Sequence, residues 1–342
     1  MSAPQPSHPS MRAAVLDAPA VPFRIAEVPR PVPAAGQVLV RVAASGVNPL
    51  DTKIQLGQAA HARHPLPAVL GIDLAGTVVA PGEGVSAFRP GDAVFGMTGG
   101  VGGVPGSLAE YAAVDADLLA PKPVTLTMRE AAALPLSVIT AWEGLVDRAR
   151  LHAGESVLVL GGAGGVGHVA VQVARAMGAR VFAVDAADKA GFLRQLGATA
   201  IDRDDPLEAV LDRWTGGRGF DVVYDTVGGP ALDLAFRAVR RHGHVVSALG
   251  WGTHALAPLS FKAASYSGVF TLLPLLTGEG RAHHGAILRH AARMAEAGHL
   301  VPRLDPRRFR LGEVDEAYRL LTGGGRQGKL VIEIDPGEAD RR

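Results

Sequence analysis

The chain has 342 residues, 48% of them hydrophobic and 20% charged, a composition typical of a globular protein with a large core. Its 34 basic and 33 acidic side chains leave a net charge of +1, which argues against a nucleic-acid partner. There is no cysteine, so disulfides, thiolate metal sites and thiol nucleophiles are excluded, and a cytoplasmic location fits this composition. No apolar stretch reaches the roughly 18 residues that predict a membrane helix, so no membrane partner is expected.

The first ten residues, MSAPQPSHPS, are rich in proline and serine and predict a disordered tail, with Met11 as a candidate start. From Met11 to about Val114, short alternating or apolar runs are broken by proline and glycine, as in QVLVRVAAS and DLAGTVVA. Runs of this kind at short spacing predict an antiparallel or barrel-like β domain.

Between Met128 and Arg150 the pattern changes to a helix, and a domain boundary is expected inside this segment. We expect a first domain over residues 11–136 and a second over 137–276. Residues 277–342 are then expected to return to the first domain. Their last apolar run, KLVIEI, predicts a strand that completes it.

The most informative motif lies between Ser156 and Asp185. An apolar run predicts a strand buried on both faces, and the G-x-G-x-x-G of Gly162, Gly164 and Gly167 follows it and opens a helix. In such a turn the glycines allow a tight bend, close approach of a pyrophosphate and packing of the helix on the sheet. The alternative is a crossover of a parallel sheet that binds nothing.

Strands and helices alternate after this motif, which predicts an α/β fold with a parallel, doubly wound sheet. Asp185 ends the second strand, where a dinucleotide site places the acid that bonds the ribose. The following strands end in small or polar residues at 225–228 and 248–250. Because ligands in such folds bind beyond the carboxyl ends of the strands, these ends are predicted to form the wall of a cofactor site.

Four stretches together resemble the medium-chain dehydrogenase/reductase superfamily, and within it the zinc-free quinone oxidoreductase (zeta-crystallin-like) branch. They are ASGVNPLDTKIQLG (44–57), PAVLGIDLAGTV (67–78), EAAALPLSVITAWEGL (130–145) and VLVLGGAGGVGHVAVQVA (157–174). The resemblance covers nearly the whole chain after Met11, and GRQGKLVIEI fits the family's closing strand. It implies a Rossmann-type doubly wound parallel sheet domain plus a β-rich GroES-like catalytic domain, assembled as a homodimer.

The chain departs from the zinc-dependent alcohol dehydrogenases of this superfamily at their metal ligands. Where those enzymes carry the first ligand, a cysteine, this sequence has the Asn48-Pro49 turn, and where they carry Gly-His-Glu it has Gly71-Ile72-Asp73. Their four-cysteine structural lobe is absent. Four histidines lack metal-ligand spacing and are expected as solvated surface imidazoles, namely His61, His64, His283 and His284. No zinc or other metal is therefore expected.

The resemblance implies an NADPH-dependent quinone oxidoreductase. Without a Lewis acid a simple ketone is difficult to reduce, whereas a quinone or an α,β-unsaturated carbonyl is already electrophilic. The expected reaction is hydride transfer from the nicotinamide to a quinone or activated enone, with the proton taken from water. Two alternatives stay open: a 2-alkenal or enoyl-thioester reductase on the same scaffold, and a non-catalytic NADPH-binding protein.

Three residues are candidates for the catalytic role by their place in the resembling motifs. Asn48 is expected to face the nicotinamide, with a turn asparagine bonded to its own backbone as the alternative. Lys53 is expected to hold substrate oxygen or cofactor phosphate, unless it is an ordinary exposed lysine. Thr140 resembles a threonine near the nicotinamide, against packing in a helix interior.

The sequence signals conflict on the choice of cofactor. Asp185 favours NAD(H), because a carboxylate bonds the ribose 2′-hydroxyl and repels a 2′-phosphate. Lys189 and Arg203 lie where NADPH-using relatives carry lysine or another polar side chain, so NADP(H) is favoured and NAD(H) is retained; either cation is otherwise a solvated charge. Trp251 and Phe270 are candidate pocket walls, with core burial as the alternative for Phe270. The candidate cofactor-binding residues are Gly162, Ala163, Gly164, Gly165, Val166, Gly167, Asp185, Lys189, Arg203, Val227, Leu249, Gly250, Trp251, Phe270 and Lys329.

Overall fold

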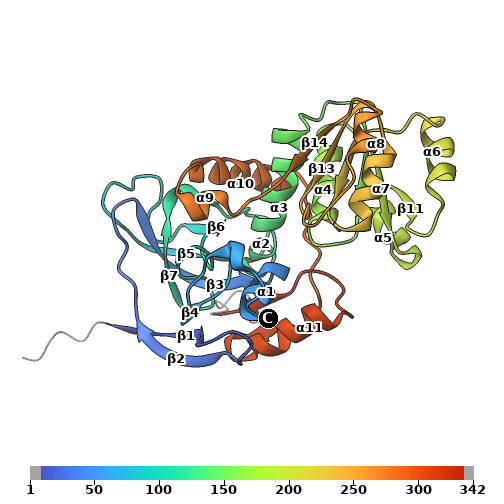
Figure 1. Ribbon diagram of the computed structural model, residues 1–342. Coiled ribbons are helices and arrows are strands. Elements are labelled where there is room, and N and C mark those ends of the chain that lie inside the picture. The colour runs from blue at the N-terminus through green and yellow to red at the C-terminus, as the bar shows by residue number, and fades with distance from the viewer. Residues whose placement is uncertain (1–8, 335–342) are drawn as a thin grey trace, which may run out of the picture. The chain divides into compact units, whose positions relative to one another are not determined.

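The computed structural model describes residues 9–334, and the chain forms two compact units (Figure 1). Of the described residues, unit 1 holds 9–136, Leu272–Glu296 and 302–334, and unit 2 holds Ser137–Thr271 and Ala297–Val301. The tail predicted over the first ten residues lies outside the described residues except for its last two, of which Ser10 already begins a strand. Within the described part of the chain, no helix is long and apolar enough to cross a membrane.

Unit 1 is built on a seven-stranded, largely antiparallel sheet. Its strands are β3 (Gln37–Gly46), β5 (Asp73–Pro81), β6 (Ala93–Met97), β7 (Tyr111–Asp115), β8 (Leu119–Pro121), β15 (Phe309–Arg310) and β16 (Val331–Glu333). They follow the order β15-β16-β3-β5-β6-β8, and β7 also pairs with β3. In β3, Val38, Val40 and Val42 share one face and are fully buried; on the other face Arg41 is exposed but Leu39 is also buried. β16 pairs antiparallel with β3, so the chain's last described strand joins the sheet formed by its first third.

A second, three-stranded sheet and several helices complete unit 1. The small sheet has the order β2-β1-β4, with β1 (Ser10–Leu16), β2 (Arg24–Pro29) and β4 (Ala68–Val69). The helices are α1 (Pro49–Gln55), α2 (Met128–Ala132), α9 (Leu273–Thr277), α10 (Arg281–Glu296) and α11 (Val314–Gly323), and the 3₁₀ turns are η1 (Ala60–Ala62), η2 (Ala116–Leu118) and η5 (Leu311–Glu313).

The helix predicted between Met128 and Arg150 is divided into three parts. α2 begins with a capping box, in which the Thr127 hydroxyl accepts the Glu130 N–H at 3.2 Å and the Glu130 carboxylate accepts the Thr127 N–H at 2.8 Å. It ends at Ala132, and α3 (Pro135–Trp142) begins at a proline, which has no N–H to continue the earlier helix. A π-helical turn, η3 (Glu143–Arg148), then follows.

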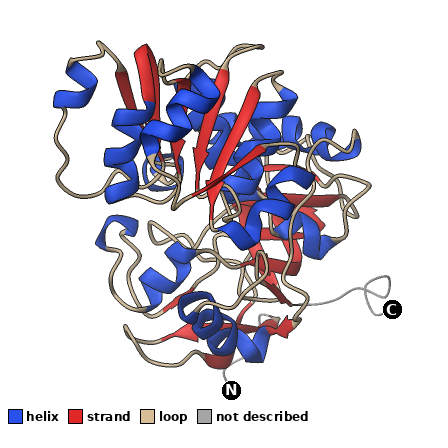
Figure 2. Ribbon diagram, turned by 90° about the vertical axis from the view of Figure 1, so that its right-hand side faces the viewer, coloured by secondary structure: helices blue, strands red, loops and turns tan. Residues whose placement is uncertain are grey.

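Unit 2 is a six-stranded sheet in which every neighbouring pair is parallel. The strands are β9 (Ser156–Leu160), β10 (Arg180–Asp185), β11 (Thr199–Asp202), β12 (Phe220–Asp225), β13 (Val239–Ser247) and β14 (Ser265–Gly268), in the order β11-β10-β9-β12-β13-β14. The connecting helices are α4 (Gly167–Ala176), η4 (Ala187–Lys189), α5 (Ala190–Gln195), α6 (Leu207–Thr215), α7 (Pro230–Ala238) and α8 (Ala257–Ser260). Figure 2 shows helices on both faces of this sheet, which confirms the predicted doubly wound architecture.

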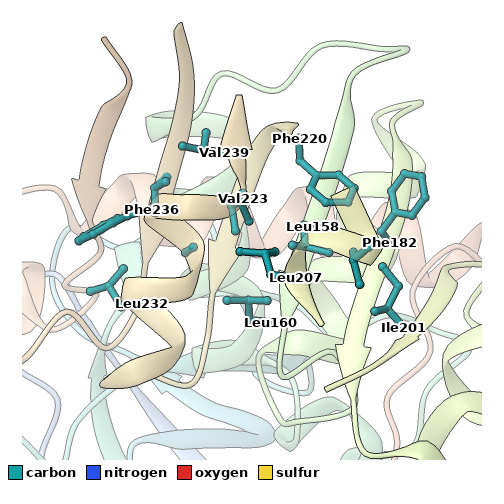
Figure 3. Close-up of a cluster of buried hydrophobic side chains, with 14 of the residues drawn as sticks. Leu158, Leu160, Phe182, Ile201, Leu207, Phe220, Val223, Leu232, Phe236 and Val239 are labelled. Carbon is teal, nitrogen blue, oxygen red and sulfur yellow. The ribbon is translucent and has the colours of Figure 1, made fainter. Parts of the chain in front are cut away.

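The core of unit 2 lies between the sheet and the helices that cover it. Every residue of β9 is buried, because both faces of this central strand are covered. Figure 3 shows Leu158, Phe182 and Phe220 among the side chains of this core. The rings of Phe182 and Phe220 lie 5.1 Å apart at a tilt, a contact that adds to their apolar burial. This core fixes the strands whose carboxyl ends carry the candidate site.

Candidate functional site

The candidate cofactor residues of unit 2 come together at one edge of its parallel sheet. Arg203 follows β11, Asp185 ends β10 and the glycine turn follows β9. Val227 follows β12, Leu249, Gly250 and Trp251 follow β13, and Phe270 follows β14. Since neighbouring strands are parallel, all six carboxyl ends lie on the same side of the sheet, where ligands of doubly wound folds bind.

The glycine turn at residues 161–167 packs too tightly for side chains at two of its motif positions. A Cβ on Gly167 would lie 2.0 Å from the Gly161 carbonyl oxygen, and one on Gly162 would lie 2.7 Å from the Ala183 Cβ. Within the described residues, the N–H groups of Gly165 and Val166 have no hydrogen-bond partner. Two unpaired N–H groups ahead of the ten-residue helix α4 fit a phosphate group.

Asp185 is engaged with the turn itself. One carboxylate oxygen accepts the Ala163 N–H at 2.8 Å and the other accepts the Ala186 N–H at 2.9 Å. The two cations predicted to favour a 2′-phosphate lie nearby in sequence. Lys189 pairs with Asp188 at 2.6 Å, and Arg203, which is exposed, donates its backbone N–H to the Asp185 carbonyl at 2.9 Å. The hydrogen bond from Lys189, with a smaller contribution from Arg203, holds the pKa of Asp188 below its usual value.

Two polar residues hold the next strand ends: Asp225, which begins the predicted strand end 225–228, and Ser247, which sequence reasoning did not name. Asp225 is fully buried, and one of its oxygens accepts the N–H groups of Val227 at 3.0 Å and Gly228 at 2.9 Å. Its other oxygen accepts the Ser247 hydroxyl at 2.7 Å, while the Ser247 oxygen accepts the Leu249 N–H at 3.0 Å. This chain of bonds fixes the loops that carry Val227 and Leu249. The sequence signal for the role of Asp225 is an acidic residue at the end of a buried strand.

The remaining candidates of unit 2 differ in exposure. Trp251 is 53% exposed, and its ring meets Phe270, which is half-buried, edge to face at 6.2 Å. The pair therefore offers an aromatic surface beyond β13 and β14. Thr140 is buried in α3, and its carbonyl accepts the Tyr224 hydroxyl at 2.6 Å. Burial raises the pKa of Tyr224 and keeps this hydroxyl a donor.

Asn48, a candidate catalytic residue of unit 1, lies in a buried polar cluster and is 1% exposed. Its amide nitrogen donates to Asp73 at 2.9 Å, and its amide oxygen accepts the ammonium group of Lys329. Its backbone N–H donates to Asp51 at 2.8 Å. Both ends of the Asn48 amide thus have partners inside the unit. Lys53, two residues after Asp51 on α1, is exposed.

The charges of this cluster are unusual for a protein interior. Asp51 and Asp73 are fully buried and Lys329 is 7% exposed. Burial raises the pKa of Asp51 to about 7 and that of Asp73 to about 6, although the Lys329 ammonium lowers both. Burial also lowers the pKa of Lys329. One oxygen of Asp51 has no hydrogen-bond partner in the described chain, so the cluster is suited to hold a proton there near neutral pH.

Residues 9–334 contain no group of three or more histidine, cysteine, aspartate or glutamate side chains arranged to hold a metal ion. Of the four histidines predicted at the surface, His284 instead lies in the interior of unit 1, where it is 1% exposed. It belongs to the buried face of α10, whose apolar neighbours Ile287 and Leu288 are also buried.

Two family models match the chain. Residues 34–124 match the model described as "Alcohol dehydrogenase GroES-like domain", and residues 196–332 match that described as "Zinc-binding dehydrogenase". The chain is 37% identical over 309 residues to the 2-methylene-furan-3-one reductase of Solanum lycopersicum, an alignment covering 88% of this chain and 72% of that protein. The chain belongs to the medium-chain dehydrogenase/reductase family. Within the family it falls in the zinc-free quinone oxidoreductase branch.

Other proteins similar to this medium-chain dehydrogenase/reductase support the same family assignment. The NADPH-dependent alkenal/one oxidoreductase of Arabidopsis thaliana is 35% identical, with 86% of this chain and 72% of that protein covered. The quinone oxidoreductase of Homo sapiens is 30% identical, with 88% and 90% covered. An alcohol dehydrogenase superfamily protein from Novosphingobium aromaticivorans has a crystal structure that superposes with a TM-score of 0.94 at 57% identity, over 95% of this chain and 99% of that one. Like these relatives, the protein is an oxidoreductase.

Proposed function

We propose that this protein is an NADPH-dependent quinone oxidoreductase that reduces a quinone or an activated enone without zinc. The observation that carries the proposal is the glycine turn, whose Gly165 and Val166 N–H groups have no partner in the described chain. They lie among six parallel strand ends, where a dinucleotide would bind. The names of three relatives, two of them enone reductases and one a quinone oxidoreductase, support the same substrate class.

The residues present fit a nicotinamide dinucleotide. The turn would hold the pyrophosphate, Asp225 and Ser247 keep the loops of β12 and β13 in place, and Trp251 with Phe270 offers an apolar surface. Bound NADPH would supply the hydride. The chain's own contribution is then to orient the bound cofactor and acceptor relative to each other.

The zinc-independent part of the proposal rests on side-chain chemistry. Asn48 stands where the zinc enzymes carry a cysteine ligand, and its amide oxygen is already bonded to the Lys329 ammonium. An amide held by a cation is a poor metal ligand, and the chain has no cysteine to replace it. A conjugated acceptor needs no such polarisation, because it delocalises the incoming charge. The proton is expected to come from water.

The preference for NADPH is the finer part of the proposal. It is supported by the name of the Arabidopsis relative and by the cations Lys189 and Arg203, whereas Asp185 favours NADH. Titration of the protein with NADPH and NADH tests it. We expect tighter binding of NADPH, and equal or tighter binding of NADH would overturn this preference.

The test of the reaction is NADPH oxidation followed with benzoquinones, 2-alkenals, cyclic enones and enoyl thioesters. We expect turnover with quinones or enones. Higher specificity for 2-alkenals or enoyl thioesters would favour the alternative reductase on this scaffold. NADPH binding without reduction of any acceptor would favour a non-catalytic protein. The homodimer and the cytoplasmic location remain predictions.

A further inference from the structure

The second residue of α4, His168, is 2% exposed and turns back onto the glycine turn. Its Nδ1 lies 2.9 Å from the Gly164 carbonyl oxygen, and its backbone N–H donates to the same oxygen at 3.1 Å. A carbonyl oxygen can only accept, so Nδ1 carries the proton of this hydrogen bond. The Gly164 carbonyl is therefore held by two donors of one residue.

This bond fixes the direction of a neighbouring N–H group. The Gly164 carbonyl and the Gly165 N–H belong to the same peptide group, which is planar and trans, so the two point in opposite directions. Holding the carbonyl toward α4 turns the Gly165 N–H away from the helix. That N–H is one of the two in the turn that have no partner in the described chain.

Asp185 holds the preceding part of the turn, because it accepts the Ala163 N–H at 2.8 Å. The Gly164 N–H donates to the Gly161 carbonyl at 2.9 Å. The turn is therefore fixed up to Gly164 by bonds that involve neither Gly165 nor Val166. His168 provides the last fixed point before these two N–H groups.

We propose that His168 is a positioning residue of the glycine turn. It holds the Gly164 carbonyl so that the Gly165 N–H stays directed at the pyrophosphate of a bound dinucleotide. The inference rests on the proposed function, since it assigns the ligand of the turn as a dinucleotide. His168 does not need to touch the cofactor. Its effect is on binding of the pyrophosphate, a group that NADPH and NADH share.

Gln172 provides a matched control one turn further along α4. It is also buried, and its side chain bonds the His168 carbonyl at 3.1 Å and both polar groups of Val301, at 3.1 and 2.8 Å. It thus ties residues 297–301 to the helix and makes no hydrogen bond to the turn. Loss of Gln172 removes buried hydrogen bonds from the same helix and leaves both donors to the Gly164 carbonyl in place.

The test compares His168→Leu, His168→Asn and Gln172→Leu by titration with NADPH and with NADH. In His168→Leu we expect the Kd of both cofactors to rise about tenfold, the equivalent of one lost hydrogen bond, with KM for the cofactor raised and kcat unchanged. Asparagine carries an N–H at the same number of bonds from Cα as His Nδ1, so His168→Asn is expected within about threefold of wild type. Gln172→Leu should lower Tm and leave both Kd values unchanged.

A second measurement needs no cofactor. Amide hydrogen exchange of the peptide covering 161–168 is expected to be faster in His168→Leu than in wild type, and unchanged in Gln172→Leu. Wild-type affinity or wild-type exchange in His168→Leu, or the same loss in His168→Asn, would overturn the inference. If the wild type binds a dinucleotide but reduces no acceptor, the proposed reaction fails and the positioning role of His168 stands. A wild-type protein that binds neither dinucleotide would overturn both.

Discussion

Gly167 is the residue at which packing most directly excludes a side chain from the candidate site. We expect Gly167→Ala to lower the free energy of unfolding by about 1–3 kcal/mol, because the added Cβ would lie 2.0 Å from the Gly161 oxygen and must displace backbone. Dinucleotide binding should weaken with it. Denaturant unfolding and cofactor titration measure the two effects.

The control is Gly191 on α5, where a Cβ would meet no atom within 4 Å and the glycine φ is not positive. Gly191→Ala is expected to raise the free energy of unfolding by about 0.5–1 kcal/mol, since alanine restricts the unfolded chain and favours a helix. Equal stabilities of the two variants would contradict the packing described for the turn.

Lys329 is the cation of the buried cluster around Asn48. Its replacement by methionine removes the partner of the Asn48 amide oxygen and the positive charge near two buried carboxyl groups. We expect Lys329→Met to destabilise the fold by about 3–5 kcal/mol in denaturant unfolding. Lys53→Met, at an exposed site on α1, should change stability by less than about 0.5 kcal/mol. A small effect at Lys329 would show that the cluster is not held by this charge.

Asp51 should give the protein a characteristic pH dependence. Its pKa is about 7 when folded and about 3.9 when unfolded, so between these values the native state binds more protons. The contribution of Asp51 to the free energy of unfolding is therefore largest below about pH 4 and is lost as the pH rises to about 7. In Asp51→Asn this loss should disappear.

The measurement is the difference in free energy of unfolding between wild type and Asp51→Asn from pH 5 to pH 8. We expect wild type to lose more than about 1.4 kcal/mol relative to the variant, which is one pKa unit. Asp212→Asn, which makes the same substitution at an exposed position on α6, serves as the control. Parallel curves for Asp51→Asn would mean that this carboxyl group titrates normally.

Part of the candidate site could be predicted at the level of residues. The G-x-G-x-x-G and the strand ends are local signals, and the structure brings those residues to one edge of a sheet. The partners of Asn48 were not predictable in this way, because Asp73 and Lys329 lie 25 and 281 residues away in the chain. His168 was overlooked because its bond runs back to a backbone carbonyl, which the sequence does not display.

At the scale of elements, the end of β12 depends on one buried acid. Asp225→Ala would leave the Val227 and Gly228 N–H groups and the Ser247 hydroxyl without their acceptor. We expect a loss of about 2–4 kcal/mol in the free energy of unfolding, together with weaker cofactor binding. Asp225→Asn, which keeps one acceptor oxygen, should lose less. An Asp225→Ala protein as stable as the exposed-site variant Asp212→Ala would contradict the role of Asp225 in fixing the loops after β12 and β13.

The type of most elements followed from local periodicity, and a capping box marks the start of α2. The alternating runs of the first third form antiparallel strands, and the βα pattern after residue 156 forms the parallel sheet. The region from Met128 to Arg150 is the instructive exception. Its helical pattern is continuous, but Pro135 starts a new helix and a π-helical turn follows. Apolar periodicity identifies the buried face of a helix, whereas a proline, which lacks a backbone N–H, decides where a new helix begins.

At the scale of the whole molecule, the fold class was predictable because each local signal agreed with the family resemblance. The pairing of β16 with β3 joins segments nearly 300 residues apart, and the order β11-β10-β9-β12-β13-β14 is set by tertiary packing. Neither is encoded in any single stretch. The substrate is still harder to predict from the sequence, since relatives with this fold carry names as different as quinone oxidoreductase and 2-methylene-furan-3-one reductase.

The central claim is that this oxidoreductase passes a hydride from NADPH to a conjugated acceptor with no metal to polarise it. The most direct measurement is the rate of NADPH oxidation with a quinone or enone before and after exhaustive chelation, with metal content determined on the same sample. The account predicts that chelation leaves the rate unchanged and that the sample contains less than one zinc ion per chain. Activity that is lost on chelation and restored by added zinc would contradict it.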